Sequence, residues 1–400
     1  MPLDPPLYLD ACATSPPADA VLAAMQAVHR QAWANPSSLH GFGLAAAEQL
    51  ERSRLQLADL LGAHSEELVF TSGGSEAIHL ALLGVCSSVP PGRLLISAIE
   101  HPATVAAAAQ LQSRGWQLEI VPVDACGHLD LDALERLLQP PTRLLSLIWG
   151  QNEVGTLQAV EAIGRRCRAA GVVLHLDAVQ VVGHQPIAFG QLPVDLLSFT
   201  AHKLQGPRGI GGLLVRRGLA LDPLISGGGQ ERGRRGGTEP VALAAGMAVA
   251  LQLAMDRLSA HGGRDPLADH RDQLLEQLLA LPGLRLSGPD PRRAEARLPH
   301  HLSLLVNLAE GQPASGRSLV RALWQEGVAA SSGSACSSGA AARAGAVAPS
   351  PVLQALGHDA AVAASGLRLS LGPWLSMQDL DAVPAAVERA LQRLRDEGSP

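Results

Sequence analysis

Short apolar runs alternate with helix-length amphipathic segments between about residues 66 and 216 of the chain. The apolar runs predict strands at 68–70, 94–97, 118–123, 144–149, 172–177, 194–199 and 212–215. Helical periodicity falls between them, for example at 75–83, 104–112 and 160–169. This alternation is typical of an α/β domain in which helices cover both faces of a mainly parallel sheet.

The pattern changes after the Gly- and Arg-rich stretch at 232–237. Helices are expected at 240–258 and 269–281, and strand-like pieces at 301–308 and 367–371. We therefore predict a large domain at 15–255 and a smaller α+β domain formed by 1–14 and 256–400. The segment at about 331–350, rich in Ala, Gly and Ser, is expected to be a loop of the smaller domain.

Composition narrows the classes of partner. The chain has 400 residues, is 47% hydrophobic and carries a formal net charge of -6, which argues against disorder. The negative net charge gives no reason to expect nucleic acid or an anionic membrane as a main partner, and 2% aromatic residues argue against base-stacking surfaces. The N-terminus does not resemble a signal peptide, and no uninterrupted apolar stretch looks long enough to span a bilayer, so we expect a cytoplasmic protein.

The five cysteines are an odd number without C-x-x-C spacing, so neither a disulfide framework nor a metal site is expected. Four of them have apolar or small neighbours and are expected to be buried: Cys12, Cys86, Cys126 and Cys167. Cys336 differs, because Ser, Gly and Ala surround it from Ser331 to Gly339. Its thiol is therefore expected to be accessible, as a nucleophilic thiolate must be.

Lys203 is the only lysine among 31 basic residues. Arginine can replace lysine as a surface charge, but its guanidinium does not readily form an imine with an aldehyde. A retained amine therefore suggests imine chemistry, although coding bias alone could also leave one lysine. Because Lys203 follows the strand expected at 194–199, its amine should lie at a strand end, where open α/β sheets hold their ligands.

Two other strand ends suit a charged cofactor. The turn from Thr71 to Glu76 opens a helix, so the amides near Gly74 and the Ser75 hydroxyl could bind a phosphate, or form an ordinary helix cap. Asp177 ends an apolar strand, where a carboxylate needs a partner such as a protonated pyridine nitrogen, unless it caps the next helix. Gln180 could then reach a ring hydroxyl.

Three further polar residues are candidates, each with a structural alternative. His101 could stack on a flat ring and exchange protons, or be a structural histidine. Asn152 could orient ligand oxygens from a strand-end loop, or be a turn residue. Arg368 could clamp a substrate carboxylate with two hydrogen bonds, or form a structural ion pair.

An ordered set of motifs runs through the chain: Tyr8-Leu9-Asp10, Asn35-Pro36-Ser37, Thr71 to Glu76, Glu100-His101, Asn152 to Gly155, Asp177 to Gln180, Ser198 to Lys203, Gly227 to Glu231, Gly237-Thr238 and Ser331 to Cys336. In these motifs the chain closely resembles the pyridoxal-phosphate-dependent cysteine desulfurases of the class-V aminotransferase family. The resemblance is to the nitrogen-fixation and iron-sulfur-cluster-assembly type and covers nearly the whole sequence. It implies fold type I of the pyridoxal-phosphate-dependent transferases.

The resemblance also implies residue roles. Lys203 would hold pyridoxal phosphate through an imine and then move the substrate α-proton, with His101 stacked on the ring and assisting. Asp177 would pair with the ring nitrogen and Gln180 would contact its phenolic oxygen. The phosphate would be held by Gly74, Ser75, Thr200 and His202, and by Thr238 from the other subunit of a homodimer. The carboxylate of L-cysteine would be bound by Asn152, Arg368 and Asn35.

The implied activity converts L-cysteine to L-alanine. The Cys336 thiolate would attack the substrate sulfur and keep it as a persulfide for an acceptor such as an iron-sulfur scaffold protein. The stretch after Cys336 looks longer than is usual for this branch. A selenocysteine lyase or an aminotransferase of the same fold is the nearest alternative, and a non-enzymatic sulfur or iron-sulfur scaffold is an alternative of another class.

Overall fold

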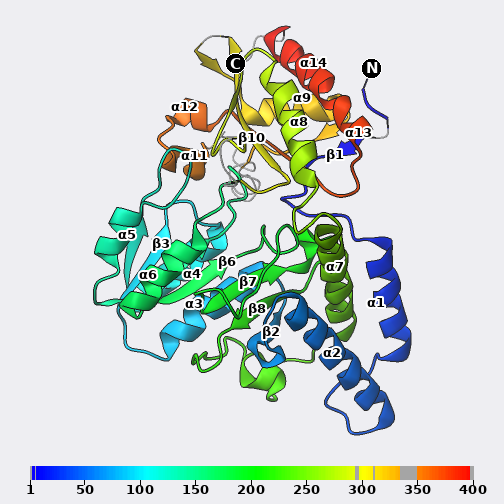
Figure 1. Cartoon of the computed structure of the whole chain (residues 1–400), viewed down its shortest axis with the longest axis vertical. Coiled ribbons are helices and arrows are strands. Elements are labelled where there is room, and N and C mark those ends of the chain that lie inside the picture. The colour runs from blue at the N-terminus through cyan, green and yellow to red at the C-terminus, as the bar shows by residue number, and fades with distance from the viewer. Residues whose placement is uncertain (1, 5, 293–296, 310, 334–348, 397–400) are drawn as a thin grey trace.

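The structure is a computed structural model that describes residues 2–4, 6–292, 297–309, 311–333 and 349–396. Cys336 therefore lies outside the described residues. The chain forms two units, each built around a sheet of its own (Figure 1). The sheet of the larger unit uses strands between residues 68 and 215, and that of the smaller unit uses strands between residues 284 and 370.

A seven-stranded sheet in the order β2-β8-β7-β6-β5-β3-β4 forms the larger unit. Its strands are β2 (Leu68–Thr71), β3 (Arg93–Ser97), β4 (Gln117–Val121), β5 (Thr142–Ile148), β6 (Val173–Asp177), β7 (Leu196–Thr200) and β8 (Gly211–Val215). The five strands from β4 to β7 in this order are parallel, whereas β8 is antiparallel to β2 and β7. The expected α/β fold is confirmed, and strand boundaries differ from the predicted ones by at most two residues.

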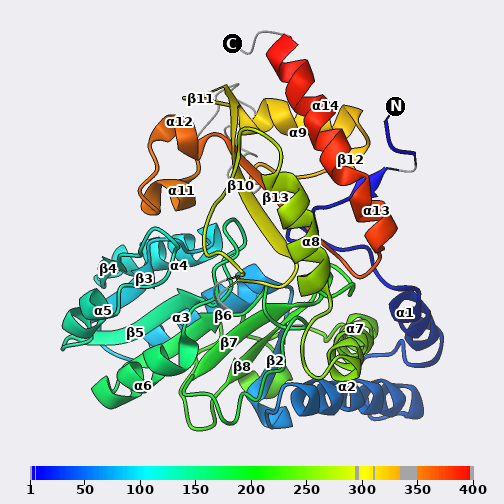
Figure 2. The same cartoon turned by 45° about the horizontal axis from the view of Figure 1, so that its top comes forward.

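Helices cover both faces of this sheet (Figures 1 and 2). One face packs against α3 (Gly74–Ser87) and α4 (Pro102–Gln112). The other packs against α1 (Asp19–Gln31), α2 (Gly41–Leu60), α5 (Leu131–Leu137), α6 (Val160–Ala170) and α7 (Val241–Ala260). Successive strand residues alternate between the faces: Leu94 joins the first cluster and Leu95 the second.

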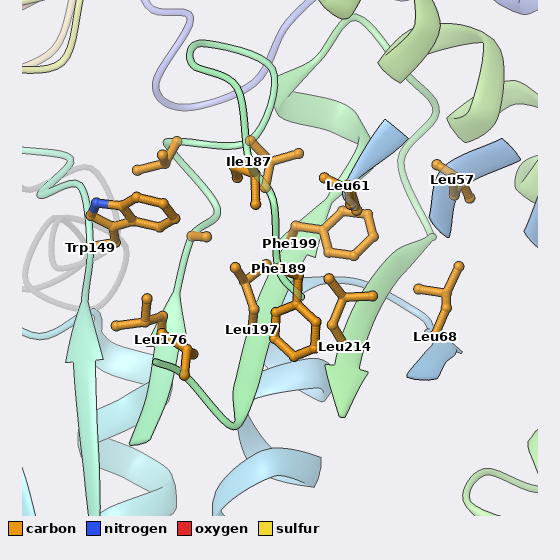
Figure 3. Packing of buried hydrophobic residues seen from close by; sticks show 14 of the residues in the cluster. Leu57, Leu61, Leu68, Trp149, Leu176, Ile187, Phe189, Leu197, Phe199 and Leu214 are labelled. Atoms are coloured by element: carbon orange, nitrogen blue, oxygen red, sulfur yellow. The ribbon is translucent and has the colours of Figure 1, made fainter. Parts of the chain in front are cut away.

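The cluster on the α2 side holds the sheet to its helices (Figure 3). Phe199 of β7 and Leu214 of β8 are fully buried beside Leu61, which directly follows α2. Burial of one such side chain contributes about 1.5–3 kcal/mol to folding. Strands that are buried on both faces read as continuous apolar runs, which is why the sequence pattern located them.

The smaller unit contains β9 (Leu284–Leu286), β10 (His301–Ala309), β11 (Gln312–Pro313) and β13 (Gly366–Ser370). They pack against α8 (Leu267–Leu279), α9 (Gly316–Gln325), α13 (Met377–Asp381) and α14 (Val383–Asp396). The short α11 (Pro351–Ala355) and α12 (Ala360–Ala363) follow residue 350. β1 (Leu7–Tyr8) pairs with β12 (Val328–Ala329), so the N-terminal segment packs on this unit, while the domain boundaries stay predictions.

From the sequence we expect no apolar stretch long enough to span a bilayer, but helix α7 is such a stretch. Its 20 residues are long and apolar enough to cross a membrane, by length and composition only. Most of that stretch is buried inside the protein, however, where α7 packs against α1 and α2. The core helix of a globular protein passes the same test, so α7 is weak support for a membrane span.

The sheet register gathers several strand ends at one edge. Ile148 at the end of β5 pairs with Asp177 at the end of β6, and Asp177 pairs with Ser198 of β7. The segments that follow β5, β6 and β7 therefore start beside one another. Lys203 belongs to one of them, the short 3₁₀ helix η2 (Ala201–Lys203) directly after β7.

Candidate active site

A cavity of about 330 Å³ lies at this edge of the large sheet. Among the described residues, it brings together ten of the candidates: Gly74, Ser75, His101, Asn152, Asp177, Gln180, Thr200, His202, Lys203 and Arg368. They come from five segments of the larger unit and from β13 of the smaller one. The cavity has the size of a small-molecule site, while the role of each residue stays a prediction.

The Lys203 amine is held by the N-terminal segment. Its Nζ donates a hydrogen bond to the carbonyl of Ala13 at 2.8 Å and a second one to the carbonyl of Cys12. The Cys12 carbonyl also accepts a hydrogen bond from Gln180 Nε2 at 3.0 Å. These carbonyls favour the protonated amine, because they accept hydrogen bonds from a charged donor.

Asp177 and His101 contribute the acid and the imidazole. The Asp177 carboxylate is buried and accepts a hydrogen bond from the Val179 amide at 3.0 Å. Burial raises the pKa of Asp177, and the charges of His101 and Lys203 act against that rise. His101 caps α4 through its Nδ1, which accepts a hydrogen bond from the Ala103 amide at 3.1 Å. His101 therefore lines the cavity, as expected, and it also has a structural role, because it caps a helix.

The start of α3 forms one wall of the cavity. Gly74 and Ser75 are the first two residues of this helix, whose amides have no partners within the helix and attract anions. Gly73 before them has φ +155° and ψ −177°, a conformation that favours glycine. His202 lines the same cavity, and burial lowers its pKa to about 4, so its imidazole is neutral near pH 7.

Arg368 reaches the cavity from β13 and is 1% exposed. Its Nη2 lies 2.6 Å from Asp10 Oδ1, so the ion pair that the sequence left as an alternative does exist. Its Nη1 donates to the carbonyls of Asn152 at 3.1 Å and Gly333 at 3.3 Å. Nε is buried and has no hydrogen-bond partner among the described residues.

Asn35 and Thr238 do not line this cavity. Both are exposed and line a separate pocket of about 460 Å³ between the end of α1 and the start of α7. Within one chain, the cavity thus lacks these two expected contacts. The proposed roles of Asn35 and Thr238 therefore stay predictions.

The structure also shows site features that the sequence did not indicate. Cys12 lies in the wall of the cavity, with its Sγ 3.4 Å from His300 Nε2. Glu100 is buried and accepts hydrogen bonds from Ser97 Oγ at 2.5 Å and, at 2.9 Å, from the amide of Ile148, a residue of the cavity wall. The expectation that Cys126 is buried is wrong, because it lies half-buried on the turn after β4. The residues next to a cysteine or glutamate in the sequence do not show which distant side chain it contacts or how exposed it is.

A primary amine, a buried carboxylate and a helix N-terminus around one cavity at the carboxyl edge of a parallel sheet define an α/β enzyme that binds a charged small molecule. The sequence matches the family model Aminotransferase class-V over residues 7–383. Two curated relatives are named cysteine desulfurase IscS. That of Dictyoglomus turgidum is 35% identical over 97% of this chain and 95% of its own length. The one from Pectobacterium carotovorum is 37% identical over 98% of this chain and 94% of its own length.

Solved structures agree with these relatives. One titled a NifS-like protein has a TM-score of 0.87 and 32% identity, covering 97% of this chain and 100% of that one. Another, titled SspA in complex with cysteine, has a TM-score of 0.77 and 30% identity, and the match covers 92% of this chain and 99% of that one. The chain therefore belongs to the class-V aminotransferase family, among its cysteine desulfurases. The expected enzyme class is confirmed, and the non-enzymatic scaffold is set aside.

Proposed function

We propose that the protein removes sulfur from L-cysteine with pyridoxal phosphate as cofactor, releasing L-alanine and leaving a persulfide on Cys336. The observation that carries this proposal is the position of Lys203, Asp177 and Arg368 around one cavity. The amine suits the cofactor aldehyde, the acid suits a ring nitrogen, and the guanidinium suits a carboxylate. Family membership supports the same reaction.

The residues of the cavity fit pyridoxal phosphate. Among the described residues, Asp177 has the Val179 amide as its hydrogen-bond partner, so a protonated ring nitrogen would supply the ion partner that a buried carboxylate needs. The amides of Gly74 and Ser75 would hold the phosphate with Thr200 and His202, because the α3 N-terminus is positive. When bound, the cofactor supplies an electron sink for charge that develops at the substrate α-carbon.

Lys203 would move the proton of the substrate α-carbon. Its Nζ would take this proton and become an ammonium group. The carbonyls of Cys12 and Ala13 already accept hydrogen bonds from that nitrogen, so they would stabilise the ammonium form. His101 lines the same cavity and would assist proton transfer, since an imidazole can accept or donate near neutral pH.

Arg368 and Asn152 would orient the substrate through its carboxylate. The guanidinium is held by Asp10 and by the Asn152 carbonyl, which fixes its plane before a substrate arrives. Binding a carboxylate beside Asp10 places two acids next to one guanidinium. The substrate carboxylate would approach the part of the guanidinium that lines the cavity and would share its positive charge with Asp10.

Cys336 would receive the sulfur. Its thiolate would attack the substrate sulfur, the carbon–sulfur bond would break, and a proton would complete the methyl group of alanine, so that L-cysteine and one thiol give L-alanine and one persulfide. The described residues on both sides of its segment support this role. The Gly333 carbonyl contacts Arg368, and Ser350 Oγ donates to Glu153 Oε2 at 2.5 Å, next to Asn152. A thiol acceptor, such as an iron-sulfur scaffold protein, would then take the sulfur.

A homodimer would complete the site with the partner subunit's Thr238. In one chain, Thr238 is exposed on a pocket separate from Lys203, so its hydroxyl is available to another copy. Trp33, which lines the same pocket as Thr238, and Phe42, at the start of α2, are 65% and 63% exposed. Their rings contact each other with centroids 5.7 Å apart. Exposed aromatic pairs of this kind are typical of a subunit interface.

The experiment that tests this function measures L-alanine and persulfide from L-cysteine without added reductant. We expect the parent to form both, and Cys336→Ser to lose persulfide and at least 99% of alanine formation, on the order of a nucleophile's contribution. Cys126→Ser is the matched control and should keep full activity, because Cys126 lies on a surface turn. Full alanine formation by Cys336→Ser would refute the persulfide route, and a keto acid as product would indicate an aminotransferase.

A further inference from the structure

Cys12 is fixed at each of its polar atoms. Its amide donates to Ser370 Oγ at 2.9 Å, and its Sγ lies 3.4 Å from His300 Nε2. Its carbonyl accepts from Gln180 Nε2 and from Lys203 Nζ. Ser370 and His300 belong to the smaller unit, whereas Gln180 and Lys203 belong to the larger one. Cys12 therefore joins the two units at the wall of the cavity.

His300 is held in turn by a buried chain of polar groups. Its ring stacks on that of His184, with centroids 3.7 Å apart and planes 15° apart. His184 Nδ1 lies 2.7 Å from Asp265 Oδ2, and Arg257 lies 3.3 Å from the same oxygen. Since Asp265 and His300 are both buried, these contacts leave the His300 ring little freedom to turn. The contact between His300 and Cys12 is thereby fixed in direction.

The thiol and the imidazole in this contact are both neutral. Burial raises the pKa of the Cys12 thiol, and burial lowers the pKa of His300 well below its ordinary value. A neutral thiol is a poor nucleophile, so Cys12 is not suited to accept sulfur. The contact is instead a single neutral hydrogen bond that fixes the backbone around Cys12.

We propose that Cys12 and His300 are positioning residues that hold the carbonyls of Cys12 and Ala13 against the Lys203 amine. The proposal rests on the function proposed above, since it concerns the amine that would carry the substrate proton. Those two carbonyls accept hydrogen bonds from Lys203 Nζ in the structure. A loosened Cys12 would let the segment shift, which would weaken the ammonium form of Lys203 and slow proton transfer without altering the grip on the substrate carboxylate.

The test compares Cys12→Ala, Cys12→Ser and His300→Ala with Cys167→Ala, in the cofactor-loaded enzyme. Cys167 is as deeply buried as Cys12 but lies on α6, so its variant controls for lost packing. Three quantities are measured: kcat and KM for L-cysteine, the pH midpoint of the visible absorption of the cofactor linked to Lys203, and the melting temperature.

We expect Cys12→Ala and His300→Ala to lower kcat about tenfold, with KM changed less than about twofold, and to shift the absorption midpoint by at least about half a pH unit. Cys12→Ser should stay within about threefold of the parent, because a hydroxyl can also hydrogen-bond His300. Cys167→Ala should lower the melting temperature and leave kcat, KM and the absorption midpoint unchanged. If Cys12→Ala and His300→Ala match Cys167→Ala in kcat and absorption midpoint, the positioning role is wrong. A parent without the absorption band would instead refute the proposed function.

Discussion

The guanidinium of Arg368 lies 2.6 Å from the carboxylate of Asp10. Arg368 lines the cavity from β13 of the smaller unit, and Asp10 belongs to the N-terminal segment. The contact joins parts of the chain that are 358 residues apart. It fixes a buried positive charge beside the cavity. The start of α3 and the Arg368 guanidinium are therefore two separate positively charged groups at one cavity.

Replacement of Arg368 by lysine tests the carboxylate site. Charge-assisted hydrogen bonds contribute about 1.5–3 kcal/mol, so Arg368→Lys should raise KM for L-cysteine at least about tenfold. Cysteamine, which lacks the carboxylate, should be a poor substrate for the parent, and the variant should discriminate less between the two compounds. Arg271→Lys is the control, because Arg271 is also buried and donates to the Leu298 carbonyl away from the cavity. An unchanged ratio of kcat/KM between cysteine and cysteamine would show that Arg368 does not bind the carboxylate.

Glu100 should make stability depend on pH. Burial raises its pKa to about 8, and its Oε2 is buried without a hydrogen-bond partner among the described residues. In the unfolded chain its pKa is about 4.3. The folded state therefore binds the proton more tightly, so its contribution to stability is fully present below about pH 4.3 and is lost as pH rises through about 8.

The amide of Glu100→Gln mimics the protonated carboxyl and does not titrate. We expect the melting temperature of this variant to fall less than that of the parent between pH 6 and pH 9. Glu48→Gln, which changes an exposed carboxylate of α2, should follow the parent. Parallel curves for parent and Glu100→Gln would show that Glu100 titrates normally.

Replacement of Trp33 by aspartate should weaken the homodimer. A buried interface tryptophan commonly contributes about 2 kcal/mol or more, so the dimer dissociation constant should rise at least about thirtyfold in sedimentation equilibrium. Trp324→Asp is the matched control, because Trp324 is 60% exposed but lies on α9 of the smaller unit. Equal dimer constants for parent and Trp33→Asp would place the interface elsewhere.

A mixture of two inactive variants tests whether Thr238 acts in the neighbouring subunit. Lys203→Ala and Thr238→Ala should each have little activity alone. A heterodimer of the two would contain one site with Lys203 of one subunit and Thr238 of the other, so co-expression should restore part of the parent activity. Lack of recovery in a verified heterodimer would contradict a shared site.

The sequence was informative about the large sheet and about the residues that follow its strands. Buried parallel strands are continuous apolar runs, and parallel strands end at one edge, so Asp177, Thr200 and Lys203 could be expected near one another. Asn152 and His101 follow strands of the same sheet and line the same cavity. The fold and the enzyme class were thus accessible from local pattern and ordered motifs.

Contacts between distant segments were not accessible in this way. Cys12 and His300 are 288 residues apart, and no local pattern indicates that a thiol and an imidazole will meet. The Arg368 ion pair with Asp10 was one of two possibilities because a strand pattern does not show which partner a buried guanidinium finds. The burial of Cys126 was predicted wrongly because small neighbours are equally compatible with a surface turn.

Borohydride reduction followed by mass spectrometry tests the central claim most directly. Lys203 is the only lysine of the chain, so pyridoxal phosphate bound as an imine leaves a phosphopyridoxyl group at one side chain after reduction. We predict that the purified protein loses its yellow colour on reduction and that the peptide containing Lys203 gains one phosphopyridoxyl group, while Lys203→Ala gains none. An unmodified Lys203 in protein that was yellow before reduction, or a label of equal yield in Lys203→Ala, would contradict the account.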